Sequence, residues 1–331
     1  MVRSRFVFKD SCLAFLFAVL AFFVVSMAFS IFIAQLAKYL GKSTQEMLEL
    51  PWVSILSSVL SELTFVLTFL IYTKTCKKSP ISDSTLSKKT TWQVSLIVAL
   101  FSIVVLLCSM NFTGMFNALF ALFAKPNSSS INLPLDTFPQ FLLGVVVLAL
   151  LPAVCEELLF RGLILSGFLK KFKPVLAVVL NAILFALIHL SIYSTIHQLI
   201  LGLVLGMIFV MTGSVFYTML FHFVNNFFVV LFSCLFKDNF PLQITTWGAW
   251  QVAVTIAVFF VGVGLTIVFY YILKKARHQY KLQEQNDGND FELKEEENNQ
   301  SFSNNDKTNA LLLVVGAAVC LIIWITNSLG G

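Results

Sequence analysis

Charged side chains are scarce in this sequence. Only 12% of its 331 residues are Asp, Glu, Lys or Arg, whereas soluble domains carry roughly 25%. Hydrophobic residues make up 58% of the chain, and its mean hydropathy is +0.87. These values exclude an ordinary soluble protein and indicate a polytopic membrane protein.

Other features are missing as well. The six cysteines occur singly with no CxxC pair, so neither a disulfide framework nor a structural zinc site is indicated. The net charge is +5, but no basic domain with reading elements accompanies it, so we expect no nucleic-acid partner. The first apolar run lacks an A-x-A-like cleavage site, and we expect it to be retained as a transmembrane helix.

Long apolar runs dominate what is present. Each has about 20 residues, enough to cross a bilayer as a helix. The runs are continuous rather than alternating, which disfavours a β-barrel. We therefore predict an all-α, polytopic transmembrane helix bundle with about 8–9 membrane-spanning helices. The candidate spans are approximately 12–36, 53–73, 93–118, 139–168, 174–192, 197–213, 215–236, 248–273 and 309–327.

The distribution of Lys and Arg predicts the orientation. Basic clusters lie on every second connection that carries appreciable charge, which favours a multi-pass protein of the cell membrane with a cytoplasmic N-terminus. The clustered residues are Arg3, Arg5 and Lys9; Lys74, Lys77, Lys78, Lys88 and Lys89; Lys170, Lys171 and Lys173; and Lys274, Lys275, Arg277 and Lys281.

The predicted organisation has five parts. A segment rich in Asn, Gln and Glu separates the last two spans, and its low apolar content predicts a disordered linker. The parts are N-terminal transmembrane helices at 1–137, a core of transmembrane helices at 138–236, a further transmembrane helix at 237–277, the polar linker at 278–308 and a C-terminal transmembrane helix at 309–331.

The fourth span contains "LPAVCEELLFRGLIL", with Glu156, Glu157 and Arg161 inside an apolar run. A charge near the bilayer centre costs roughly 2.5–3.5 kcal/mol, so such residues are expected to pair and face the bundle interior. Glu157 and Arg161 are four residues apart and lie on one helix face, which predicts an ion pair. Glu156 points about 100° away and is free for another partner.

Two later spans supply possible partners for Glu156. "FALIH" places Phe185 and His189 four residues apart, and "HFVNN" places His222 and Asn226 in the same relation. An isolated intramembrane His or Asn more often serves only as an interhelical hydrogen-bond partner. That is the interpretation we favour for His197, Asn181 and Asn225.

Glu62 lies in the middle of the second span, in "SSVLSELTFVL". An acidic residue there is costly and calls for a reason. The sequence leaves three interpretations open: a structural contact, a protonated carboxyl group or part of a relay.

Together these motifs resemble those of the CPBP family (CAAX protease and bacteriocin processing, also called Abi) of intramembrane glutamic endopeptidases. Its EExxxR, FxxxH and HxxxN motifs are intact here and in order, over approximately residues 138–236. The resemblance implies peptide hydrolysis by a glutamate-activated water. It implies Glu156 as general base, His189 positioning the water, and His222 and Asn226 as oxyanion donors. The supporting residues would be Glu157, Arg161 and Phe185.

Three alternatives remain open at this point. Two histidines and a glutamate could bind zinc, although the HExxH pattern is absent and Arg161 would repel a dication, so we expect no cofactor. A transporter would be expected to show repeated halves, and none is evident. A non-catalytic bacteriocin-immunity or binding protein could use the same scaffold. The expected partners are membrane lipid and a peptide or protein substrate in or at the membrane.

Overall fold

The computed structural model describes residues 6–78, 90–123, 134–237, 247–286 and 304–329, and within them helix is the only regular secondary structure. The prediction of an all-α fold is confirmed. The elements are α1 (Phe8–Tyr39), α2 (Thr44–Leu48), α3 (Pro51–Thr75), α4 (Trp92–Phe120), α5 (Phe138–Gly144), the π-helix η1 (Val145–Leu150), α6 (Leu151–Glu157), the π-helix η2 (Leu158–Leu165), α7 (Ser166–Phe168), α8 (Pro174–Leu187), α9 (Ile192–Thr212), α10 (Val215–Phe236), α11 (Ala249–Asn286) and α12 (Asn304–Leu329).

Eight stretches of the described chain are long and apolar enough to cross a membrane, with α5 through α7 counting as one stretch of 31 residues. Their outer faces expose large apolar side chains, as Val24, Ile31 and Phe32 do on α1. Such faces suit lipid rather than water. The protein is therefore a multi-pass membrane protein, as predicted.

The prediction of a span at 174–192 is wrong in its length. Helix α8 has 14 residues, or about 21 Å at 1.5 Å per residue, shorter than a hydrocarbon core of about 30 Å. The chain turns at Leu190, whose φ of 52° is left-handed, and α9 begins at Ile192 rather than near residue 197. Hydropathy does not detect this turn, because apolar residues continue through it.

Helices α8 and α9 pack closely because two glycines face α8. A Cβ atom on Gly202 would lie 3.0 Å from the Cα of Ala182, and one on Gly206 would lie 2.8 Å from a methyl carbon of Val178. Small residues four apart let helix backbones approach in membranes, where apolar burial does not drive helices together. This contact fixes the height of the α8–α9 turn.

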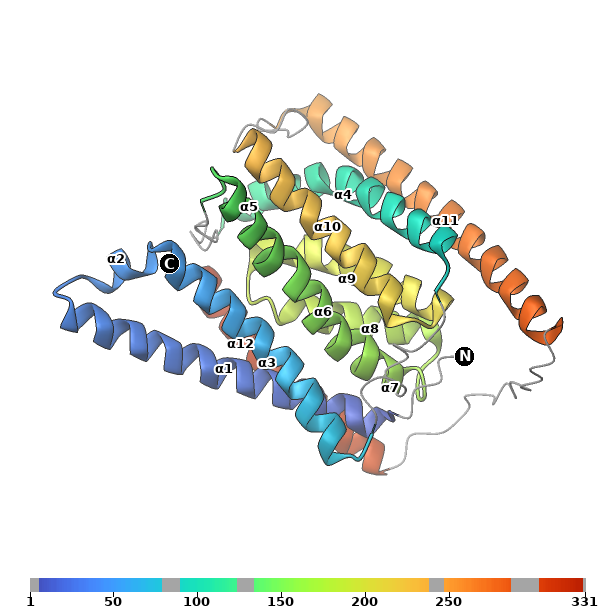
Figure 1. Cartoon of the computed structure of the whole chain (residues 1–331), viewed down its shortest axis with the longest axis horizontal. Coiled ribbons are helices and arrows are strands. Elements are labelled where there is room, and N and C mark those ends of the chain that lie inside the picture. The colour runs from blue at the N-terminus through green and yellow to red at the C-terminus, as the bar shows by residue number, and fades with distance from the viewer. Residues whose placement is uncertain (1–5, 79–89, 124–133, 238–246, 287–303, 330–331) are drawn as a thin grey trace.

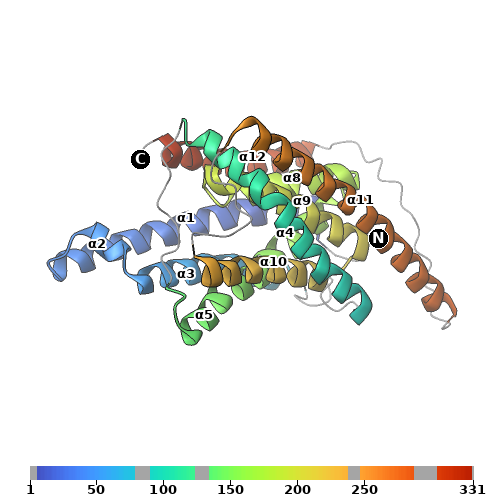
Figure 2. The same ribbon diagram turned by 90° about the horizontal axis from the view of Figure 1, so that it is seen from above.

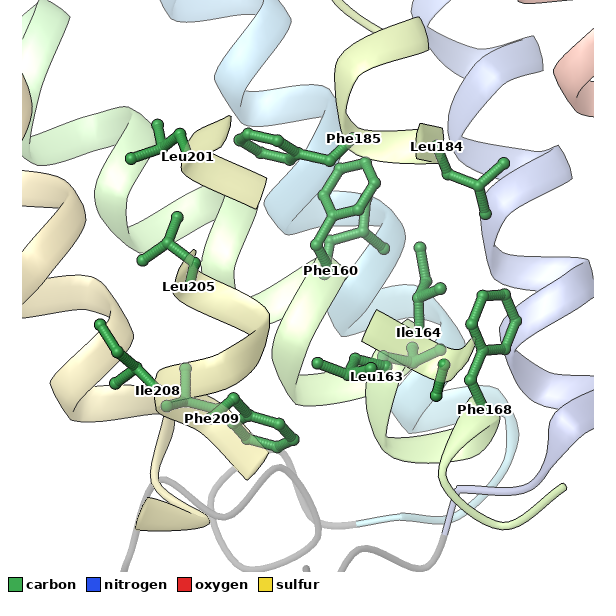
Figure 3. Packing of buried hydrophobic residues seen from close by; sticks show 14 of the residues in the cluster. Phe160, Leu163, Ile164, Phe168, Leu184, Phe185, Leu201, Leu205, Ile208 and Phe209 are labelled. Carbon is green, nitrogen blue, oxygen red and sulfur yellow. The ribbon is translucent and has the colours of Figure 1, made fainter. Parts of the chain in front are cut away.

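The bundle divides into two groups of helices around a central unit. Helix α1 packs on α3 and α12, and α4 packs on α10 and α11. Figure 1 shows α5 through α10 between these groups, and Figure 2 shows α4 and α11 side by side from above. The central unit is held by buried apolar side chains from η2, α7, α8 and α9, drawn in Figure 3. Its labelled members are Phe160, Leu163, Ile164, Phe168, Leu184, Phe185, Leu201, Leu205, Ile208 and Phe209.

Polar contacts tie several helix termini together at one end of the bundle. Asp10 at the start of α1 accepts a hydrogen bond from Tyr72 near the end of α3 at 2.9 Å and pairs with Lys78. Lys171, just after α7, pairs with Asp306 at the start of α12 at 2.8 Å. Three of the basic clusters used for the topology prediction therefore lie near one another. Members outside the described residues are Arg3, Arg5, Lys88 and Lys89.

The predicted disordered linker at 278–308 is wrong at both ends. Helix α11 continues to Asn286 and α12 begins at Asn304, while 287–303 lie outside the described residues. The sequence "ARHQYKLQEQN" is rich in good helix formers, so the helix continues after the apolar run ends. An acidic residue in the first turn, Asp306, suits the positive end of the α12 dipole.

The glycine packing leads to a stability prediction. Gly202→Ala places a methyl group against the Ala182 backbone, which cannot rotate away, and is expected to destabilise the protein by about 1–3 kcal/mol. Gly264→Ala is the matched control, because its added Cβ meets nothing within 4 Å and a helical alanine is favoured over glycine. Thermal unfolding of the purified variants in detergent measures both. Equal melting temperatures would contradict the close approach of α8 and α9.

Candidate active site

A buried ion pair lies at the centre of the bundle. The Arg161 Nη1 donates to Glu157 Oε1 at 2.8 Å, and both side chains are 0% exposed. The Nη2 of Arg161 donates to the carbonyl oxygen of Gly202 at 3.3 Å, and the guanidinium carbon lies 4.5 Å from the centre of the Phe185 ring. The ion pair predicted from the spacing is present. It also joins η2 to α8 and α9.

His222 on α10 completes this network. Its Nδ1 lies 3.0 Å from Glu157 Oε1, the oxygen that also accepts from Arg161. An ionised carboxylate only accepts hydrogen bonds, so His222 Nδ1 carries the hydrogen. In a neutral ring Nε2 is then an acceptor. That atom lies 3.9 Å from Glu156 Oε2.

His189 approaches Glu156 from the end of α8. Its Nδ1 lies 2.7 Å from the Phe185 carbonyl oxygen, which only accepts, so Nδ1 is the donor and a neutral Nε2 is again the acceptor. Nε2 lies 3.7 Å from Glu156 Oε1. Glu156 is 5% exposed, and within the described structure its buried Oε2 has no hydrogen-bond partner. The His189 side chain is 21% exposed and forms the accessible side of the group.

Asn226 has a different environment from the one predicted. Its Nδ2 donates to the carbonyl oxygen of Leu148 at 3.2 Å. Leu148 lies in the π-helix η1, in which backbone N–H groups donate to carbonyl oxygens five residues earlier, as Leu151 does to Val146. The bond from Asn226 therefore connects α10 to η1. Its second amide hydrogen is not used by this bond.

The structure thus brings Glu156, His189 and His222 together from three separate helical stretches. Phe185 lies among them, fully buried, with its ring centre 5.0 Å from that of His189 and 6.1 Å from that of His222. Figure 3 shows it beside Phe160. Asn226 lies one turn beyond His222 on α10, with one amide hydrogen already engaged.

Glu62, for which the sequence left three interpretations open, also belongs to this group. It is 8% exposed on α3, which packs on α6, and its carboxyl group interacts with that of Glu156. Its only signal in the sequence was an acidic residue in mid-span. Spacing could not identify the partner, because α3 and α6 are nearly a hundred residues apart along the chain.

The described side chains around Glu156 provide few free ligands for a metal ion. No group of three or more His, Cys, Asp or Glu side chains suited to a metal occurs in the part of the chain that the structure describes. One Glu157 oxygen is occupied by both Arg161 and His222. The Arg161 guanidinium would also oppose a dication electrostatically.

Comparison with known families gives one match. Residues 138–228 match the family described as type II CAAX prenyl endopeptidase, Rce1-like, which confirms the resemblance predicted from the three motifs. The match contains all seven predicted site residues and excludes Glu62. Neither the curated proteins nor the solved structures gave a significant match. The matched family is one of proteases, which supports an endopeptidase.

The buried ion pair leads to a second stability prediction. Arg161→Met leaves the Glu157 carboxylate buried without its cation, and such a loss typically costs about 3–5 kcal/mol. Lys237→Met is the control, because Lys237 pairs with Asp136 at 3.2 Å with side chains 74% and 64% exposed, and an exposed pair contributes about 0–1 kcal/mol. Thermal unfolding in detergent compares them. A similar small shift in both variants would contradict the central role of the buried pair.

Proposed function

We propose that the protein is an intramembrane endopeptidase in which Glu156 activates a water molecule to hydrolyse a peptide bond of a membrane-associated or lipidated substrate. The observation that carries the proposal is the position of the Glu156 carboxylate, 3.7 Å from His189 Nε2 and 3.9 Å from His222 Nε2 inside the bundle. Both distances exceed a direct hydrogen bond, and one water can bridge such a separation.

The acceptors around Glu156 suit a bound water. A water between Glu156 and His189 would donate one hydrogen to the carboxylate and one to Nε2, because Nδ1 of His189 is committed to the Phe185 carbonyl. As the water oxygen attacks the peptide carbonyl carbon, its proton passes to Glu156. When the C–N bond breaks, the amine nitrogen takes that proton and the carboxylate is restored.

The developing oxyanion would be stabilised from α10. Asn226 has a second amide hydrogen for this purpose, and neutral donors aimed at an oxyanion act strongly where water is excluded. His222 can donate from Nε2 only when its ring is protonated, because Nδ1–H already faces Glu157. The Glu157 carboxylate is placed to balance that charge. The ion pair with Arg161 in turn keeps Glu157 ionised and in position.

The substrate is proposed at the level of class. Lipidated C-terminal tails, bacteriocin leader peptides and membrane-anchored regulatory proteins all present a peptide bond near lipid. We place the N-terminus and the end of the bundle that carries Lys78 and Lys171 in the cytoplasm, because basic residues favour that side. We expect the active site to open toward that side.

Substitution of the proposed base is the direct test. Glu156→Gln and His189→Ala are each expected to lower kcat/KM for cleavage of a membrane-anchored or lipidated reporter peptide by at least about 10², the lower range for general base catalysis. Purified protein in liposomes and mass spectrometry of the products provide the measurement. Glu46→Gln is the control, because Glu46 lies on α2 in an exposed capping box and glutamine can also cap.

Turnover that is unchanged in both site variants would contradict these roles. A wild-type protein that binds such peptides and cleaves none would favour the non-catalytic immunity or binding function.

A chelator distinguishes the zinc alternative. Cleavage is expected to continue unchanged after incubation with 1,10-phenanthroline and EDTA, because the proposed base acts on water without a Lewis acid. The rate before and after chelation is the measurement, with a known zinc protease treated in parallel as the control. Activity that is lost on chelation and restored by added zinc would overturn the metal-free mechanism.

A further inference from the structure

Among the residues that the structure describes, Glu62 is the one acidic side chain at the candidate active site that lies outside the family match. It comes from α3, which packs directly on α6, the helix that carries Glu156. Figure 1 shows α3 running beside α6. The two acidic groups interact across this helix contact. Both side chains are more than nine-tenths buried, and in the described structure the buried Oε2 of each has no hydrogen-bond partner.

Little positive charge lies near Glu62 that could balance a second negative charge on this pair. The only carboxylate on α1 that contacts α3 is that of Asp10, through Tyr72, about 15 Å along α3 from Glu62 at 1.5 Å per residue. In the described structure, the titratable and charged groups that face Glu62 or Glu156 from the elements packed against them are Cys155, Glu157, Arg161, His189 and His222. Arg161 is on the Glu156 side and is already paired.

Two facing carboxylates in such a place cannot both be ionised. Like charges in contact at low dielectric repel strongly, so the pair retains a proton between them. The contact therefore implies a shared proton.

We propose that Glu62 is a positioning residue for the reaction, which shares one proton with Glu156 and keeps the remaining Glu156 oxygen ionised toward the water. This proposal rests on the proposed function for its catalytic consequence. The protonated Glu62 donates to one Glu156 oxygen, which orients the carboxylate and stabilises its charge. The other oxygen remains free to accept a hydrogen bond from the water.

The Glu62–Glu156 pair can then both accept the proton from the water and deliver a proton to the leaving amine. In the resting state the two carboxyl groups hold one proton and one negative charge. On attack, the water oxygen bonds to the carbonyl carbon and its proton makes both groups neutral. On C–N cleavage, one of these protons moves to the amine nitrogen, and the pair returns to its resting state with no other reactant.

A purely structural contact explains Glu62 less well. Replacing a buried polar pair by apolar residues of similar volume is often neutral or stabilising. A leucine at position 62 would fill the space between α3 and α6 without bringing a second carboxyl group to the pair. A carboxyl group that faces only another carboxyl group adds a cost that a structural role does not require.

The pH dependence of cleavage tests the proposal. Glu62→Leu removes the donor, so kcat/KM at pH 7 is expected to fall about 10–100-fold, with the acid limb of the profile moved to higher pH, because a lone buried carboxylate is harder to ionise. Glu62→Gln keeps a donor but has no proton to lose. The kcat/KM of Glu62→Gln should therefore fall less than that of Glu62→Leu. The part of the alkaline limb that arises from loss of the shared proton should be absent from its pH profile.

Thr68→Val is the matched control on the same helix. Thr68 is buried, and its hydroxyl donates only to the Thr64 carbonyl oxygen of α3 itself. Its pH profile should coincide with that of the wild type. Wild-type profiles in both Glu62 variants would overturn the proposal, as would a loss of activity that leaves the limbs of the profile unmoved.

An infrared spectrum separates this proposal from the proposed function. At pH 7, without substrate, the wild type should show a protonated-carboxyl C=O stretch that is absent from the Glu62→Gln/Glu156→Gln double variant. This result would support the shared proton even if no tested peptide were cleaved. Identical spectra in that region would overturn the shared proton, even in an active enzyme.

Discussion

The buried pair of Glu157 and Arg161 is the interaction on which the rest of the site depends. Each charge alone would cost several kcal/mol inside a bilayer, and at 0% exposure neither reaches water. Their pairing neutralises both. The remaining hydrogen-bonding capacity of the pair then reaches Gly202 on α9 and His222 on α10, so that three helical stretches are held in register around one guanidinium.

This arrangement determines what remains for chemistry. Because Glu157 is occupied, Glu156 is the carboxylate that can face other groups, and it faces His189, His222 and Glu62. The tautomer of each histidine follows from the acceptor that its Nδ1 faces. This acceptor is the Phe185 carbonyl oxygen for His189 and the Glu157 carboxylate for His222. Both Nε2 atoms are thereby directed at Glu156 as acceptors in their neutral forms.

The backbone contributes irregular geometry at the same place. The stretch from Phe138 to Phe168 contains π-helical segments on both sides of the Glu156–Glu157 turn, and such segments are frequent at functional sites. Asn226 donates from α10 to the carbonyl oxygen of Leu148 within the first of these segments. Asn226 thus fixes α10 against η1 while one of its hydrogens remains for another acceptor.

Much of this could be predicted from the sequence, and the exceptions have physical reasons. Apolar run length predicted the helical bundle, and four-residue spacing predicted the contact of Glu157 with Arg161 and identified Phe185 and His189 as neighbours on one helix, because these are properties of a single helix. The length of α8 could not be predicted, since the turn at Leu190 is made by an apolar residue with positive φ. The partner of Glu62 could not be predicted either, because pairing between distant helices depends on packing that spacing does not encode.

Isotope labelling provides the most direct test of the central claim that Glu156 acts through water. The measurement is a single turnover in H₂¹⁸O with enzyme in excess over peptide, followed by mass spectrometry of the product and of the protein. The account predicts one ¹⁸O atom in the new C-terminal carboxylate and none in Glu156. Unlabelled product with ¹⁸O in the Glu156 side chain would show direct attack by the carboxylate and would contradict the account.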